Sequence, residues 1–258
     1  MALAIERKNL ILEKLTRDKK VVVSELSAEF ECSEETIRRD LEKLEKEGFA
    51  IKSYGGAILN EDNDKDMPFM LRQKKNMEGK KVIAKIIANR IQNGEHLFID
   101  PSSTGVSLVR ALENAEKKRL SIITNSVEVL LELSDNDEWE IISTGGKLVD
   151  NYLALVGPKC LSSIESFHAD RVILSCKGLD MARGITDANE QFSQVKQFML
   201  KNADQKILAV DNTKFDKVAF SQICPLDDLD IVVTDKKPSE AWLKYFEDKG
   251  IECIYGDE

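Results

Sequence analysis

The chain has 258 residues, of which 42% are hydrophobic and 32% are charged, and its formal net charge is −9. This length is sufficient for two domains, one of them with a sizeable hydrophobic core. The negative charge excludes long-range attraction of nucleic acid by the whole molecule, so any basic surface has to act locally. No apolar run is long enough to span a bilayer and no signal peptide opens the chain, so we expect a cytoplasmic protein.

Cysteine and histidine usage argues against a metal centre. The five cysteines show no C-x-x-C spacing, and the two histidines are His96 and His168. Zinc clusters need closely spaced cysteines and histidines, whereas free thiols are ordinary in a reducing compartment. We therefore expect reduced cysteines, no bound metal and no cofactor.

Residues 1–60 have the spacing of three short helices. Two amphipathic segments, 6–17 and 24–30, precede a tight connection at Glu31 and Cys32. Ser33 is a good N-cap for the third helix, and Gly48 ends that helix. This spacing predicts a helix-turn-helix, in which one helix enters the major groove of DNA.

Helical periodicity separates two faces of the third helix. Ile37, Leu41 and Leu44 share one face and are expected to pack inward. Arginine guanidinium groups suit phosphate oxygens and the acceptor edge of guanine, so two arginines on the other side favour DNA contact. The residues of this helix that we expect to contact DNA are Ser33, Thr36, Arg38, Arg39, Lys43 and Lys46.

The alternative for this helix is a solvated surface stabilised by ion pairs. Residues 1–60 contain eleven Lys/Arg and twelve Asp/Glu, so the segment is not basic overall. The preceding helices and the segment that follows nevertheless favour the DNA-binding interpretation. The i,i+4 pairs that would stabilise the helix weakly are Glu34–Arg38, Glu35–Arg39 and Glu42–Lys46.

A β-hairpin is predicted directly after this helix, over residues 49–59. Two short apolar runs flank Tyr54-Gly55-Gly56, and the glycines permit the positive φ angles of a tight reversal. A strand pair in this position makes a winged helix, in which Lys52 and Tyr54 can touch the DNA backbone or the minor groove. A hairpin that only caps the small core is the alternative, and it is compatible with this interpretation.

With these residues in place, the segment resembles the N-terminal domain of the DeoR family of bacterial transcriptional repressors. The wing matches from Tyr54 to Ala57, with Tyr54 where a histidine is more usual. The spacing follows the family pattern throughout, so the resemblance implies a DNA-binding repressor. The helical residues that match are Arg7, Ile11, Leu15, Ser33, Thr36, Ile37, Arg38, Arg39, Asp40 and Leu41.

The remainder of the chain predicts an α/β domain. Residues 60–68 are polar and acidic and end in proline, which indicates a linker. From about residue 70, apolar strands alternate with helical segments, which predicts a mainly parallel sheet covered by helices on both faces. The strands are predicted at 97–100, 121–124, 140–143, 171–175, 207–211, 231–234 and 252–255, and the helices at 80–92, 104–113, 127–133, 191–202 and 239–249.

We therefore expect an α+β multidomain protein with three parts. These are a winged helix-turn-helix domain at 1–59, a linker at 60–74, and an effector-sensing and oligomerisation domain at 75–258.

Polar loops follow several of the predicted strands. Parallel sheets bind ligands where the carboxyl ends of their strands meet. The loop at 100–105, D-P-S-S-T-G, also begins a helix, so its N–H groups suit an anion, although an ordinary capping turn is the alternative. Together the loops predict a pocket for a polar, phosphorylated ligand. The loop residues expected to line it are Asp100, Ser102, Ser103, Thr104, Thr124, Asn125, Gly145, Gly146, Lys177, Asp211 and Lys214.

The same loops resemble the sensor domain of the DeoR family, so the resemblance covers nearly the whole chain. In that family the sensor is similar to ribose-5-phosphate isomerase, and typical inducers are phosphorylated sugars. The family's usual glutamate before Lys80 is Gly79 here, and its usual glycine in the first loop is Ser102. The resemblance implies phosphate contacts from Ser102, Ser103 and Thr104, and contacts to the sugar or its phosphate from Lys80, Asp211 and Lys214, with Arg72 as a further candidate.

Other interpretations of these residues stay open. Lys214 and Asp211 could form a structural ion pair, and Lys80 could be an ordinary surface lysine. An enzyme with retained sugar-phosphate isomerase chemistry would need a carboxylate base and a nearby electrophile. Candidates are Asp100, Asp187 and Glu190 for the base and Lys177 for the electrophile, but their spacing is not diagnostic.

The sequence thus predicts a transcriptional regulator. An attached DNA-binding domain favours a sensor over a catalyst, and an architectural DNA binder would leave the α/β domain without a purpose. We expect a repressor of a sugar-metabolism operon that binds double-stranded operator DNA as a homodimer or homotetramer and is released by a phosphorylated sugar. The alternative is that the ligand activates the regulator instead of releasing it from DNA.

Overall fold

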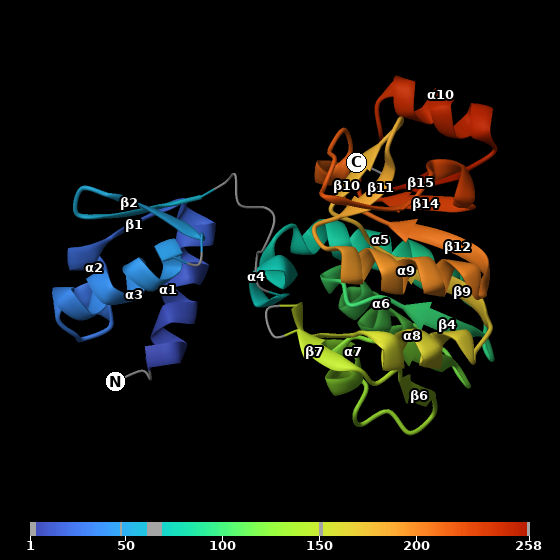
Figure 1. Cartoon of the computed structure of the whole chain (residues 1–258), viewed down its shortest axis with the longest axis horizontal. Coiled ribbons are helices and arrows are strands. Elements are labelled where there is room, and N and C mark those ends of the chain that lie inside the picture. The colour runs from blue at the N-terminus through green and yellow to red at the C-terminus, as the bar shows by residue number, and fades with distance from the viewer. Residues whose placement is uncertain (1–3, 47, 61–68, 150–151, 257–258) are drawn as a thin grey trace. The chain divides into compact units, whose positions relative to one another are not determined.

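The structure is a computed structural model that describes residues 4–46, 48–60, 69–149 and 152–256. The chain divides into two compact units, Met1–Leu71 and Arg72–Glu258 (Figure 1). Residues 69–74 of the predicted linker form a helix, α4 (Phe69–Lys74), and residues 61–68 lie outside the described residues. The expected boundaries at 1–59, 60–74 and 75–258 stay a prediction.

The N-terminal unit is a winged helix-turn-helix, as predicted. Its helices are α1 (Ala4–Asp18), α2 (Val23–Glu29) and α3 (Glu34–Lys46). The predicted hairpin consists of β2 (Ala50–Ser53) and β3 (Gly56–Leu59). A strand that was not predicted, β1 (Lys20–Val22), pairs antiparallel with β3, so the order is β1-β3-β2.

The core of this unit packs α1 against α3. Ile11 and Leu15 of α1 and Ile37, Leu41 and Leu44 of α3 are each at most 2% exposed. Burying one such side chain stabilises a fold by about 1.5–3 kcal/mol, so these five positions hold the helices together.

The sensor unit is built on a seven-stranded parallel sheet with the order β15-β14-β12-β9-β4-β5-β6. All seven predicted strands are confirmed, with shifts at their ends. Their bounds are β4 (His96–Ile99), β5 (Ser121–Thr124), β6 (Glu140–Ser143), β9 (Ala169–Leu174), β12 (Ala203–Ala209), β14 (Ile231–Thr234) and β15 (Glu252–Tyr255).

Helices cover both faces of this sheet, as predicted. In Figure 1, α5 and α6 lie behind the sheet, and α8 and α9 lie in front of it. The helices are α5 (Met77–Arg90), α6 (Ser103–Asn114), α7 (Val127–Glu132), α8 (Pro158–Glu165), α9 (Glu190–Lys201) and α10 (Glu240–Lys249); α8 was not predicted.

Two small antiparallel sheets were also missed by the sequence analysis. Their strands have only three or four residues and pair antiparallel, outside the large sheet. One is the hairpin of β7 (Lys147–Val149) and β8 (Ala154–Val156), and the other has the order β10-β11-β13, from β10 (Gly178–Asp180), β11 (Gly184–Asp187) and β13 (Ser221–Cys224).

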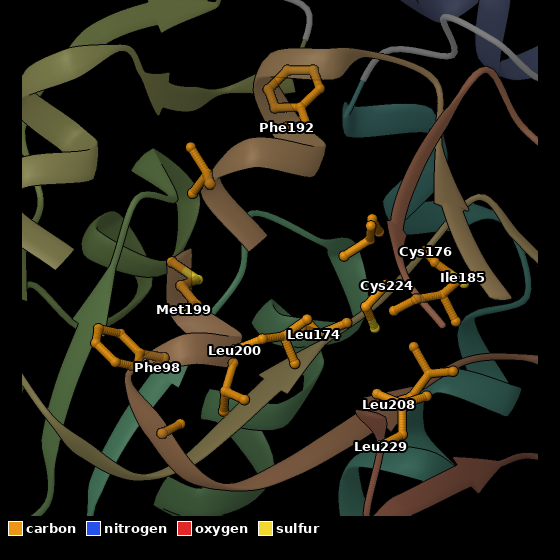
Figure 2. Close-up of a cluster of buried hydrophobic side chains, with 14 of the residues drawn as sticks. Phe98, Leu174, Cys176, Ile185, Phe192, Met199, Leu200, Leu208, Cys224 and Leu229 are labelled. Atoms are coloured by element: carbon orange, nitrogen blue, oxygen red, sulfur yellow. The ribbon is translucent and has the colours of Figure 1, made fainter. Parts of the chain in front are cut away.

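One hydrophobic cluster connects the large sheet to α9 and to the β10-β11-β13 sheet. Figure 2 shows Phe98, Leu174 and Leu208 from β4, β9 and β12 together with Met199 of α9 and Ile185 of β11. All five side chains are at most 1% exposed.

Among the described residues, no helix is both long enough and apolar enough to cross a membrane.

Candidate functional site

Helix α3 is held in place by apolar contacts and by one buried ion pair. Asp40 accepts a hydrogen bond from Arg7 Nε of α1 at 2.7 Å, and both side chains are buried. Removing one partner of such a pair leaves an uncompensated charge, which typically costs about 3–5 kcal/mol. The pair therefore fixes the rotational setting of α3 against α1.

The opposite face of α3 is exposed and carries the predicted DNA-contacting residues. Ser33 caps the helix, since its Oγ accepts a hydrogen bond from Thr36 N at 3.2 Å. Thr36 is half-buried beside this cap. The side chains that project from the helix with large exposure are Arg38, Arg39, Lys43 and Lys46.

Ion pairs on this surface are exposed and therefore weak. The two pairs within α3 that involve arginines are as predicted, but Glu42, expected to pair with Lys46, is bound by Lys52 of β2. Exposed pairs contribute about 0.2–1 kcal/mol each, so a DNA phosphate can replace a carboxylate at small cost. The pairs are Arg38–Glu34 (2.6 Å), Arg39–Glu35 (3.3 Å) and Lys52–Glu42 (2.9 Å).

The wing presents its turn to solvent. Tyr54 is fully exposed between β2 and β3, and Gly55 has a φ of 75°. Gly56 cannot be replaced without movement, because a Cβ there would lie 2.0 Å from the carbonyl oxygen of Val21 in β1. The close approach of β1 thus supports the hairpin that carries Lys52 and Tyr54.

In the sensor unit, the polar loops meet at one edge of the sheet. All strands of the seven-stranded sheet are parallel, and the direction of winding changes between neighbouring strands β4 and β9. Ligands of such sheets bind in the crevice at this switch point. The loops that follow β4 and β9 are joined there, since Asp100 Oδ2 accepts a hydrogen bond from Ser175 N at 2.9 Å.

The first loop has the form of an anion-binding helix start. Ser102 is the N-cap of α6, and its Oγ accepts a hydrogen bond from Gly105 N at 2.9 Å. Ser102, Ser103 and Thr104 are all buried, and α6 runs for 12 residues, so its N–H groups and dipole favour negative charge at this end. Ser103 Oγ donates to the carbonyl oxygen of Arg72 at 3.3 Å.

Lys196 of α9 is a central residue that the sequence analysis missed. Its Nζ lies 3.1 Å from Asp100 Oδ2 and 2.6 Å from Asp187 Oδ2, and it donates to Ser175 O at 2.6 Å. Burial opposes the charge of Lys196, but Asp187 and Asp100 outweigh it and raise the pKa of this lysine. Burial likewise opposes the charge of Asp187, but Lys196 outweighs it and lowers the pKa of that carboxyl group. The network fixes the loop after β4 and strand β11 on one ammonium group.

One signal in the sequence could have revealed Lys196. Within the predicted helix at 191–202, Phe192, Val195 and Met199 define the apolar face, and Lys196 lies beside Val195 and three residues before Met199. A lysine on a buried face needs carboxylate partners, and Asp100 at a strand end was available.

Lys80 of α5 also lies at this edge and is buried rather than on the surface. Its Nζ donates to the carbonyl oxygens of Arg72 and Lys75. Burial lowers the pKa of Lys80 to about 8, partly offset by the carboxylate of Asp211 and reinforced by the positive charge of Lys214. Lys80 and Ser103 therefore converge on one oxygen atom, the carbonyl oxygen of Arg72.

The loop after β12 supplies the other predicted contacts. Asp211 caps the 3₁₀ helix η2 (Asn212–Lys214), and its Oδ1 accepts a hydrogen bond from Thr213 N at 3.0 Å. Lys214 is half-buried, and its charge acts on Lys80. The structure thus brings Asp211 and Lys214 into electrostatic range of Lys80.

The remaining predicted residues lie at the same edge. Thr124 Oγ1 donates to Ile99 O at 2.7 Å, and Asn125 Nδ2 donates to Leu155 O of β8 at 2.8 Å. Within the described part of the chain, Asn125 Oδ1 is a buried acceptor with no hydrogen-bond partner. Gly145 and Gly146 both have positive φ angles, and Lys177 Nζ lies 5.9 Å from the centre of the Tyr152 ring.

The carboxylates considered for catalysis are differently placed. Both oxygens of Asp100 are engaged, by Ser102 N at 3.3 Å and by Ser175 N, and Asp187 is bound by Lys196. Glu190 is exposed in the first turn of α9. Asp100 and Asp187 are thus held by Lys196 and by backbone N–H groups, and Glu190 faces solvent, whereas the hydroxyls, lysines and helix N-terminus suit anion binding.

No group of three His, Cys, Asp or Glu side chains that could hold a metal ion occurs in residues 4–46, 48–60, 69–149 and 152–256. A winged helix-turn-helix unit joined to an α/β unit whose polar loops gather at the carboxyl ends of its parallel strands is typical of a DNA-binding regulator with an effector-binding domain.

Comparison with known families agrees with this class. Residues 7–63 match the DeoR-like helix-turn-helix domain, and residues 75–236 match the DeoR C-terminal sensor domain. The chain belongs to the DeoR family of transcriptional regulators.

Relatives of similar length are regulators rather than enzymes. The chain is 37% identical over 249 residues to the HTH-type transcriptional regulator YulB of Bacillus subtilis, covering 96% of this chain and 95% of YulB. It is 30% identical over 253 residues to the HTH-type transcriptional repressor GlcR of Bacillus subtilis, covering 98% of this chain and 96% of GlcR.

A partial likeness to a solved enzyme structure also exists. Ribose 5-phosphate isomerase A of Methanocaldococcus jannaschii matches with a TM-score of 0.41 and 15% identity, over 55% of each chain. A likeness at this level does not bear on function. The relatives that match over nearly the whole chain are transcriptional regulators, which argues against the enzyme interpretation.

Proposed function

We propose that this regulator represses a sugar-metabolism operon and that a phosphorylated sugar releases it from the operator. The observation that carries the proposal is the convergence of Lys80 and Ser103 on one oxygen atom beside the N-terminus of α6. An ammonium group and a hydroxyl that meet at one oxygen atom, beside the N–H groups that begin a helix, suit the oxygens of a phosphate group.

The sugar part of the ligand rests on the chemistry beside this anion site. Asp211 and the buried acceptor Asn125 Oδ1 lie at the same sheet edge, and acceptors of this kind suit sugar hydroxyl donors. The resemblance to the family, whose typical inducers are phosphorylated sugars, supports the same class of ligand.

The DNA part of the proposal uses α3 and the wing. Ser33, Thr36, Arg38, Arg39, Lys43 and Lys46 on α3, with Lys52 and Tyr54 on the wing, would contact double-stranded operator DNA. One short helix reads one half-site, so we propose a homodimer or homotetramer, assembled through the sensor unit, that presents two helices to a two-fold operator.

The sign of regulation follows from linkage. An effector that binds the operator-free conformation more tightly than the bound one weakens DNA binding by the same factor, typically through a coupling of about 1–3 kcal/mol. GlcR, a relative over nearly the whole chain, is named a repressor, whereas a relative of equal identity is named the L-fucose operon activator, so the release experiment decides the sign.

Two measurements test the function. A thermal-shift screen of a panel of sugar phosphates, with the free sugars as controls, should find a stabilising phosphorylated member. That compound should then release the protein from operator DNA in a gel shift at fixed salt. Stabilisation by the free sugars alone would refute the anion site, and tighter DNA binding with the compound would refute release from the operator by the effector.

The oligomeric state has its own test. Sedimentation of the full chain should give a dimer or larger species at the concentration at which it binds its operator. A monomer that binds the operator with nanomolar affinity would contradict this part of the proposal.

A further inference from the structure

The donors assigned to the effector are already in use as a helix cap. The last carbonyl groups of a helix have no partners within the helix and need donors from elsewhere. At the end of α4, Lys80 Nζ binds the carbonyl oxygens of Arg72 and Lys75, and Ser103 Oγ binds the same Arg72 oxygen. The cap therefore consists of one side chain from α5 and one from the start of α6.

The helix that receives this cap is short and occupies the boundary between the two units. α4 has six residues, Phe69–Lys74, and the chain passes from the first unit to the second between Leu71 and Arg72. A helix of this length is unstable by itself, so its end depends on contacts made from outside.

The side chain of Arg72 attaches the same turn to another part of the sensor. Its guanidinium carbon lies 5.0 Å from the centre of the Tyr152 ring, and Tyr152 packs against Phe192 of α9 at 4.3 Å between ring centres. Burial lowers the pKa of Arg72, and the carboxylates of Asp187 and Asp100 oppose this shift. The turn is thus held both by its carbonyl oxygens and by its side chain.

We propose that the anionic group of the effector competes with the Arg72 carbonyl oxygen for Lys80 and Ser103, so that a filled site uncaps α4. A phosphate oxygen carries negative charge and accepts hydrogen bonds from an ammonium group more strongly than a neutral carbonyl does. Occupancy then exchanges one acceptor for another and loosens the helix that leads to the DNA-binding unit. This inference rests on the proposed function, because it concerns the same site.

Hydrogen exchange measured by mass spectrometry on the full chain tests the competition. The probe is inorganic phosphate at millimolar concentration, with sodium chloride at matched ionic strength as the reference. Phosphate should slow exchange in the peptide that covers residues 100–106, because it occupies the start of α6. It should accelerate exchange in the peptide that covers residues 69–76, because α4 loses its cap.

A matched pair of variants isolates the cap. Ser103→Ala removes one of its donors and should accelerate exchange at 69–76 about fivefold without phosphate, which corresponds to about 1 kcal/mol. The control is Ser107→Ala, on the same helix, whose hydroxyl donates within α6, to Ser103 O at 3.1 Å, rather than to Arg72 O. The control should leave exchange at 69–76 unchanged.

The outcomes separate the site from the switch. Protection at 100–106 with unchanged or slower exchange at 69–76 would overturn the competition and leave the proposed function intact. Absence of protection at 100–106 would overturn the anion site and the competition together. Equal acceleration in Ser103→Ala and Ser107→Ala would show that the cap does not hold α4.

Discussion

The two charged regions of this protein differ in how their charges are held. On α3 the arginines pair with glutamates four residues away, and both members of each pair are exposed. In the sensor, Lys196 contacts Asp100 and Asp187, and all three side chains are buried. An exposed pair can exchange its carboxylate for a DNA phosphate, whereas a buried network keeps loops in one arrangement. The difference separates charges that can contact DNA or a ligand from charges that hold the binding loops in position.

The strongest test of this comparison removes the buried ammonium group. Lys196→Met keeps the side-chain volume but leaves two carboxylates buried together, so we expect the sensor to lose about 3–5 kcal/mol of stability. At roughly 2–4 °C per kcal/mol, the melting temperature should fall by about 10 °C. The control is Lys201→Met, an exposed position on the same helix, which should change stability by less than about 0.5 kcal/mol. Equal melting temperatures of the two variants would mean that the Lys196 network does not stabilise the sensor.

Lys214 tests the part of the sensor that we propose to meet the ligand. Lys214→Ala removes one charge from a half-buried position, so effector affinity should fall roughly tenfold to a hundredfold, as expected for a hydrogen bond to a charged group. Operator affinity and melting temperature should stay close to those of the original protein, and cells should remain repressed. Lys244→Ala, exposed on α10, is the control. Release of Lys214→Ala from DNA at the original effector concentration would remove this residue from the site.

The arginines of α3 test the exposed side of the comparison. Arg38→Ala and Arg39→Ala should each weaken operator binding by about 1–3 kcal/mol if the guanidinium group reads a base. Stability should change by less than about 0.5 kcal/mol, because each loses only an exposed ion pair. Gel-shift titration at fixed salt measures the first effect and thermal unfolding the second. Lys81→Ala, in the sensor unit, controls for the loss of one positive charge, and unchanged DNA affinity in both arginine variants would exclude α3 as the recognition element.

A smaller effect on effector affinity is expected from pH. Lys80 belongs neither to the exposed ion pairs of α3 nor to the buried network of Lys196. It is buried near Asp211, Lys214, Arg72 and Lys75, and burial lowers its pKa to about 8. Its protonated form attracts an anion, so effector affinity should be full below pH 8 and fall as the pH rises above 8. Phosphate monoesters have a second pKa of about 6, so the ligand charge is constant in this window.

The decrease between pH 7 and pH 9 should be at most about tenfold, since one proton is involved. Calorimetric titration across this range measures it. Lys80→Met should bind more weakly and lose this dependence on pH. A dependence that survives in Lys80→Met would assign the titration to another group.

Local patterns predicted much of this fold. The strands of the parallel sheet carry apolar residues at successive positions, as Ile122-Ile123 and Ile231-Val232-Val233 do, because both faces of the sheet are covered. The rule that carboxyl ends share one edge also predicted that the loops after β4 and β9 meet. Strands β1, β7 and β10 were missed because three residues show no period, and their pairing depends on distant partners.

Contacts between distant residues were harder to predict. Lys196 is part of an amphipathic helix. Its carboxylate partners, Asp100 and Asp187, lie 96 and 9 positions before it in the chain. The pairing of Glu42 with Lys52 was missed for the same reason, because helical spacing describes only neighbours within one helix. Lys80 was expected to be either a surface lysine or a ligand contact, and its role as a cap of α4 has no local signature.

The buried pair Arg7–Asp40 has a consequence for how operator choice can change. One residue of rotation turns a helix by about 100°, which would carry Arg38 and Arg39 away from the surface they now share. Because Asp40 must reach Arg7, the pair opposes such rotation. If α3 reads the operator, as we propose, base preference then changes through the outward side chains. A library randomised at Thr36, Arg38, Arg39 and Lys43, with Arg7 and Asp40 unchanged, should therefore yield folded proteins with new operator preferences.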